Sequence, residues 1–60
     1  MYVIRRNDGN FVADMRKTRT GGSYTPALQC ARVYGTKEAA EGDLCPENER
    51  VVSIQSIIEG

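Results

Sequence analysis

The chain has 60 residues with no formal net charge at neutral pH, and 40% of its residues are hydrophobic. This length leaves room for one domain, residues 1–60, that buries only about 60% of the surface its unfolded form exposes. A zero net charge argues against a polybasic nucleic-acid binder, and no apolar run reaches the roughly 18 residues of a membrane span. The N-terminus lacks the pattern of a signal peptide, so the expected location is the cytoplasm.

The charges are divided unevenly along the chain. Residues 1–35 carry six basic and two acidic side chains, a net of +4, whereas residues 36–60 carry two basic and six acidic side chains, a net of −4. Such polarity can steer partners of opposite charge, while plain solvated surface explains the same charges equally well.

Residues 2–15 predict a β-hairpin. Residues 2–6 and 11–15 are rich in strand formers, and the pair Asp8-Gly9 between them is a strong turn signal because glycine tolerates positive φ.

Residues 16–23 form a polar, basic loop by composition. Arg16, Lys17 and Arg19 precede the glycine pair, whereas a Walker-type phosphate loop has its lysine after the glycines. We therefore expect a surface loop, with a contact loop for a phosphate backbone or an acidic partner as the alternative.

The chain is expected to turn at Pro26, which fixes its own φ and biases the residue before it toward an extended conformation. Tyr24 is then either a lid over the end of the sheet or an exposed aromatic residue of a binding surface. Residues 29–34 alternate in polarity and predict a strand ending at Gly35, although residues 27–32 also tolerate a helix.

A short helix is predicted after Thr36, whose hydroxyl can accept a bond from an unpaired N–H of the first turn. Glu38 suits the positive end of the helix dipole, and Ala39 and Ala40 are small enough to lie flat on a sheet. Gly42 either ends this helix or lies within a slightly longer one. Because two turns do not hold alone in water, we expect strands to cover the alanine side.

A turn at residues 45–48 leads to a last strand at residues 49–54. Residues 55–58 either extend this strand or turn once beyond it, and Ile57 and Ile58 need burial under the sheet or in a partner. The predicted fold class is α+β, a small antiparallel sheet in the order β-β-β-α-β with one short helix on one face.

Four short stretches form a pattern: residues 24–25 (Tyr-Thr), residues 31–34 (Ala-Arg-Val-Tyr), residues 36–41 (Thr-Lys-Glu-Ala-Ala-Glu) and residues 50–52 (Arg-Val-Val). This pattern resembles that of short uncharacterised proteins from bacteriophages and prophages, from which Gly42 departs. The resemblance implies a small α+β domain of a mobile element that binds and inhibits a host protein. It implies no catalytic residues.

The sequence offers little for catalysis. It has no histidine, and Cys30 and Cys45 cannot complete a mononuclear zinc site without carboxylates or a second chain. A disulfide between them stays open, although a reducing compartment disfavours it. Glu38 and Glu41 would share one helix face, which is ordinary solvated surface. We therefore predict a protein that is not an enzyme and holds no cofactor or metal.

The predicted function is protein interaction, with a host or cellular protein or with a second copy in a homodimer, because open sheet faces and edges are docking surfaces. The candidate contact residues come from the basic loop, the tyrosines, the acidic helix and the C-terminal isoleucines: Arg16, Lys17, Arg19, Tyr24, Tyr34, Glu38, Glu41, Ile57 and Ile58.

Nucleic-acid binding through the basic N-terminal half is the alternative function. Its supporting residues are the basic side chains and the tyrosines near them: Arg5, Arg6, Arg16, Lys17, Arg19, Arg32, Tyr2, Tyr24 and Tyr34. The acidic second half would repel a phosphate backbone if it shared the same face.

Overall fold

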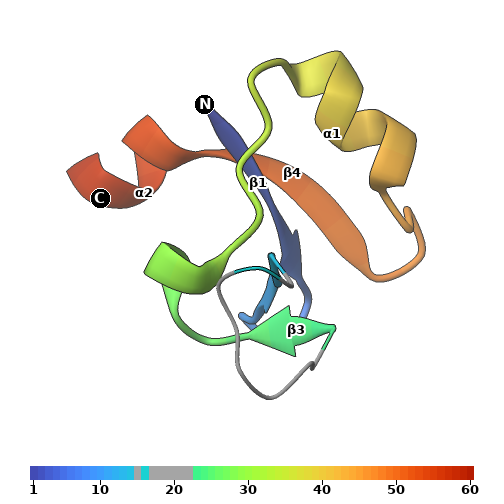
Figure 1. Ribbon diagram of the computed structural model, residues 1–60, viewed down its shortest axis with the longest axis horizontal. Helices are drawn as coiled ribbons and strands as arrows, with labels where there is room; N and C mark the ends of the chain where they lie inside the picture. The colour runs from blue at the N-terminus through green and yellow to red at the C-terminus, as the bar shows by residue number, and fades with distance from the viewer. Residues whose placement is uncertain (15, 17–22) are drawn as a thin grey trace.

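A computed structural model describes residues 1–14, 16 and 23–60 of the chain. The elements follow in the order β1 (Tyr2–Arg6), β2 (Phe11–Val12), β3 (Tyr24–Thr25), the 3-10 helix η1 (Leu28–Cys30), α1 (Lys37–Asp43), β4 (Glu49–Ser53) and α2 (Ile54–Glu59). The four strands form one antiparallel sheet in the order β3-β2-β1-β4. This architecture confirms the predicted α+β class and adds a second helix, α2, at the far end of β4 from α1 (Figure 1).

β1 and β2 form the predicted hairpin and pair at Arg5 and Phe11. Gly9 in the turn has a φ of 93°, a left-handed conformation that glycine adopts without strain. Asp8 accepts a 3.0 Å bond from the backbone N–H two residues further on, which closes the turn. β2 is two residues long and so shorter than the strand predicted for residues 11–15: Ala13 makes only an isolated bridge, Asp14 is not in a strand, and Met15 lies outside the described residues.

The strand predicted for residues 29–34 is wrong, because β3 supplies the third strand and η1 occupies the start of that stretch. What remains makes two isolated β-bridges, Ala31 with Ala13 and Tyr34 with Tyr2. β1 and β2 pair directly only beside their turn. Farther from the turn, the start of this segment bonds to the β2 side and its end, Tyr34, bonds to Tyr2 of β1. Each bridge is a single residue pair, and neither extends into a ladder.

The sheet is covered on both faces. On one face the buried residues are Val3, Phe11 and Ala31, packed against Leu28, Val52, Ile54 and Ile57. On the other face they are Ile4, Tyr34 and Ala40, packed against Tyr2, Val12, Leu44 and Val51. α1 therefore covers one face and η1 with α2 the other, so the expectation of a single helix on one face describes only half of the molecule.

α1 begins as predicted, because the Thr36 hydroxyl accepts a 3.1 Å bond from the Ala39 N–H. Gly42 lies inside the helix and Leu44 caps its end, which selects the longer of the two predicted helices. Ala40 is fully buried, whereas Ala39 is exposed. Only one of the two alanines expected against the sheet is therefore covered.

β4 ends one residue earlier than predicted, and α2 follows it directly. This is the second of the two alternatives for residues 55–58, a turn beyond the strand, and it takes the form of a six-residue helix. The Ile54 N–H donates a 3.0 Å bond to the Met1 carbonyl, which extends the contact between the chain start and β4. The two α-helices among the described residues have seven and six residues, far fewer than a bilayer crossing requires.

Candidate functional site

The basic loop contributes one described residue to the candidate surface. Arg16 is exposed, its N–H donates a 3.0 Å bond to Asp14, and its Nε lies 3.7 Å from the same carboxylate. Lys17 and Arg19 lie outside the described residues, so the structure does not place them.

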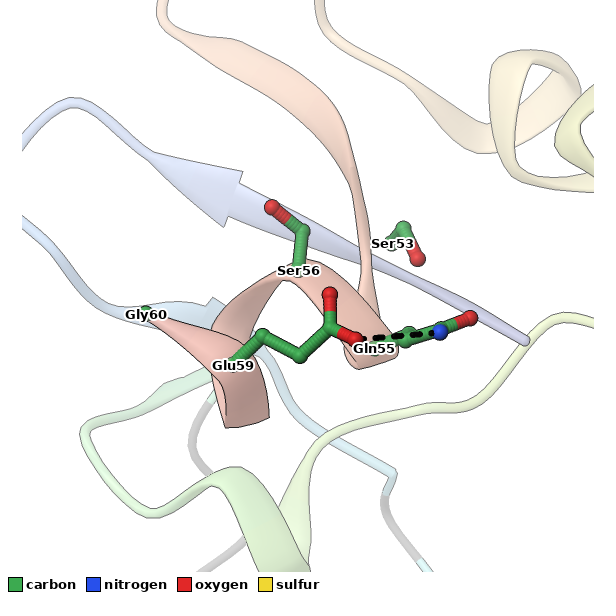
Figure 2. Close-up of a pocket in the computed structure, with 5 residues that line it drawn as sticks. All are labelled: Ser53, Gln55, Ser56, Glu59 and Gly60. Carbon is green, nitrogen blue, oxygen red and sulfur yellow. Dashed lines mark hydrogen bonds between the residues drawn. The ribbon is translucent and has the colours of Figure 1, made fainter.

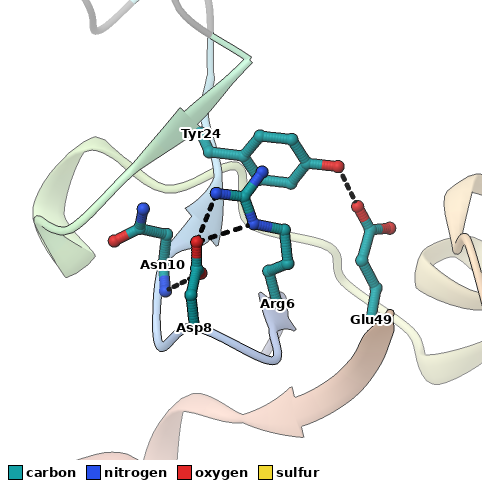
Figure 3. A network of polar contacts seen from close by, with 5 residues as sticks. All are labelled: Arg6, Asp8, Asn10, Tyr24 and Glu49. Atoms are coloured by element: carbon teal, nitrogen blue, oxygen red, sulfur yellow. Dashed lines mark hydrogen bonds and ion pairs between the residues drawn. The ribbon is translucent and has the colours of Figure 1, made fainter. Parts of the chain in front are cut away.

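Tyr24 belongs to a polar network that joins three strands (Figure 3). Its hydroxyl donates a hydrogen bond to Glu49, and the Arg6 guanidinium lies 3.9 Å from the centre of its ring. Glu49 is buried and also accepts a 2.9 Å bond from the Cys45 N–H. Arg6 in turn forms a two-bond ion pair with Asp8.

Three groups of this network have shifted pKa values. The bond to Asp8 raises the pKa of Arg6, and the same bond lowers the pKa of Asp8. The hydrogen bond to Glu49 raises the pKa of the Tyr24 hydroxyl. Because the charged and polar groups satisfy one another, we interpret the network as a link that fixes β3 against β1 and β4.

Tyr34 lies in the core rather than on the surface, with 7% of its area exposed. Its hydroxyl donates a 2.8 Å bond to Asp43, and the Arg32 guanidinium lies 5.5 Å from its ring and 3.8 Å from the Asp43 carboxylate. Burial, with the neighbouring carboxylate second, raises the pKa of Tyr34 to about 12. This group joins residues 31–34 to the end of α1.

The remaining candidate residues lie in the two helices. Glu38 and Glu41 are exposed on α1. Ile57 of α2 is half-buried and packs against the core. Ile58 is 74% exposed and lies beside Met1, which is 71% exposed, on a shallow depression where the chain start meets α2. These two side chains form an apolar patch that the described residues do not cover.

A second depression on α2 is lined by Ser53, Gln55, Ser56, Glu59 and Gly60 (Figure 2). Gln55 donates a 3.3 Å bond to Glu59, and Ser56 points away from that pair. The depression thus pairs no hydroxyl with a base, which a nucleophilic serine requires. Cys30 and Cys45 are free thiols, and the described residues include no cluster of three metal-ligating side chains.

β4 is an edge strand, because in the described sheet it pairs with β1 alone. The bonds from the Ile54 N–H to Met1 and from the Asn7 N–H to Asn48 show which residue pairs of the β1–β4 ladder are hydrogen-bonded. Hydrogen-bonded and non-hydrogen-bonded pairs alternate along an antiparallel ladder. Val51 and Ser53 therefore direct their N–H groups away from β1, toward the open side.

Arg50 is the second residue of this edge strand and lies directly opposite Arg5 of β1. Arg50 is exposed, and no described carboxylate forms an ion pair with either arginine. Arg50 is not among the contact residues predicted from the sequence. A charged residue within a valine-rich strand is typical of a sheet edge, and that signal could have identified it.

Comparison with protein-family models, with curated proteins and with solved structures finds no match to this chain.

Proposed function

We propose that this chain is a small protein-interaction module that adds an extended segment of another protein to the open edge of β4. The observation that carries the proposal is the direction of the Val51 and Ser53 N–H groups, which point away from β1 toward the open edge of the sheet. Strand addition at such an edge gives affinity through main-chain hydrogen bonds. The exposed Met1 and Ile58 side chains extend the surface at the end of this strand.

The finer proposal is that the bound protein belongs to a bacterial host and is inhibited or modulated by the chain. It rests on the resemblance to bacteriophage and prophage proteins. The alternative, nucleic-acid binding, is weakened by the ion pairs that occupy three of its arginines, Arg6 with Asp8, Arg16 with Asp14 and Arg32 with Asp43.

A proline at position 53 tests edge pairing with little effect on the fold. Ser53 has a φ of −70°, which matches the angle that proline imposes, and its side chain makes no capping bond. Proline is tolerated on an edge strand where the N–H faces solvent. Ser53→Pro therefore removes one outward donor, while Ser53→Ala keeps it and serves as the matched control.

The experiment is affinity capture from a bacterial lysate with mass spectrometry, using the original chain and both variants after nuclease treatment. We expect the Ser53→Ala variant to retain the proteins captured by the original chain and Ser53→Pro to lose them, with circular dichroism confirming that both variants are folded. Equal capture by a folded Ser53→Pro variant would contradict the proposal.

A further inference from the structure

The pairing register places a row of four side chains across one face of the sheet: Thr25, Phe11, Arg5 and Arg50. The first two are buried, and the row ends at the open edge in two adjacent arginines. The Arg5 guanidinium lies 5.5 Å from the centre of the Phe11 ring, on the side of β1 away from β4. Arg50 is exposed and has no carboxylate partner among the described residues.

Two like charges directly opposite in a ladder destabilise the sheet. Arg6, the neighbour of Arg5 in β1, has its charge balanced by Asp8, whereas the Arg5–Arg50 pair lacks a balancing carboxylate in the described chain. An anion held beside Arg50 would relieve this repulsion and gain a charge-assisted hydrogen bond.

From this geometry we infer that the segment received at the edge of β4 is acidic, with an Asp or Glu directly across from Arg50. This inference rests on the proposed function and names the chemistry of the partner. Arg50 directs its own backbone groups toward β1, so a strand on its open side meets it in a non-hydrogen-bonded pair, the arrangement that brings side chains closest. The residue across from Val51 then faces the half-buried apolar surface on the other side of the sheet.

A second copy of the chain fits this edge less well. An antiparallel pair of β4 strands centred on Val51 would set the two copies of Arg50 diagonally on one face, within reach of each other. Arg5 of each copy would add to that positive cluster. A nucleic acid would satisfy the arginines but could not accept and donate bonds alternately along β4, and its further phosphates would meet the acidic second half of the chain.

The test uses the full chain labelled with nitrogen-15 and a blocked peptide, Ser-Thr-Val-Glu-Val-Thr-Ser, observed by nuclear magnetic resonance. Two twin peptides carry Gln or Lys in place of Glu, and a single-stranded oligothymidylate is the polyanion control. We expect the Glu peptide to slow hydrogen exchange at the Val51 and Ser53 amides and to bind at least about tenfold more tightly than the Gln twin. Arg50→Glu should reverse the preference toward the Lys twin, while the charge reversal Lys37→Glu at the exposed start of α1 leaves it intact.

The outcomes separate the inference from the proposed function. Equal binding of the Glu and Gln peptides, with protection of both edge amides, would overturn the acidic partner and leave edge pairing standing. Absence of protection with every peptide would overturn both. Oligothymidylate binding that shifts Arg50 without protecting Val51 would point to nucleic acid instead. Protection that rises with protein concentration alone would identify a second copy.

Discussion

Arg5 and Arg50 lie directly opposite each other in the β1–β4 ladder, and no described carboxylate forms an ion pair with either of them. The neighbouring pair in the same ladder, Arg6 and Glu49, carries opposite charges. The strand could therefore hold a stabilising pair at Arg50 as well. Positions that break a local rule of stability are found most often at functional sites, which is why we assign the binding role to Arg50.

Changing Arg50 should raise stability while weakening the proposed binding. Arg50→Gln removes the repulsion with Arg5, and Arg50→Glu replaces it with attraction. The free energy of unfolding should therefore rise from the original chain to the Gln variant and again to the Glu variant, by up to about 1 kcal/mol in all. Urea unfolding at low salt measures this order, and high salt should narrow the differences. A lower stability of the Gln variant would show that Arg50 is not repelled in the folded state.

Removing the Tyr24 hydroxyl should destabilise the sheet. Tyr24→Phe leaves the buried Glu49 carboxylate with one fewer donor, and the loss of a hydrogen bond to a charged group should lower the free energy of unfolding. Tyr2→Phe is the matched control, because the Tyr2 hydroxyl bonds to no described side chain. Equal unfolding free energies for the two variants would show that the Tyr24–Glu49 bond contributes nothing.

The local structure was the part of this fold that the sequence could predict. The Asp8-Gly9 turn and the Thr36 cap are each determined by residues within a few positions of one another, and both are present. The strand expected at residues 29–34 failed for a different reason. Alternation reports which side chains share a face, but a ladder also requires a neighbouring strand of matching length, and each strand beside this segment offers it a single bridge.

The candidate site depended on strand order, which no local pattern in the sequence encodes. The sequence could not show that β4 lies at an edge or that Arg50 meets Arg5 in register. For the same reason Tyr34 was selected as a surface anchor, although its bridge to Tyr2 places it in the core. Exposed Ile58 is the one selected apolar residue that lies fully on the surface.

Gly42 offers a stabilising substitution. It lies inside α1, and an added Cβ there would meet no atom within 4 Å. Gly42→Ala should therefore raise the free energy of unfolding by about 0.5–1 kcal/mol, since alanine loses less backbone entropy in a helix. Gly9→Ala is the contrasting variant, because its φ of 93° is strained for any residue with a Cβ, and it should lower stability by about 1–2 kcal/mol. Thermal unfolding of the two variants should shift in opposite directions, and a shift of Gly42→Ala to lower temperature would contradict the helical assignment.

Tyr34 should make the fold sensitive to alkaline pH. Its pKa is raised from 10.0 to about 12 in the folded chain, chiefly by burial, so the folded state keeps a proton that the unfolded state loses above pH 10. Stability from this group is thus complete below pH 10 and falls as the pH rises from about 10 to about 12. Urea unfolding across that range measures the slope.

Two variants assign this slope to its source. Tyr34→Phe removes the ionisable group and should reduce the alkaline loss of stability, at the expense of the hydrogen bond to Asp43 at neutral pH. Tyr24→Phe should retain the part of the loss that Tyr34 causes, because the buried Tyr34 hydroxyl is still present in that variant. Parallel losses of stability above pH 10 in Tyr34→Phe and the original chain would show that the Tyr34 hydroxyl is accessible to water. The core beneath α1 would then be more open than the packing of Tyr34 against Ile4 and Ala40 indicates.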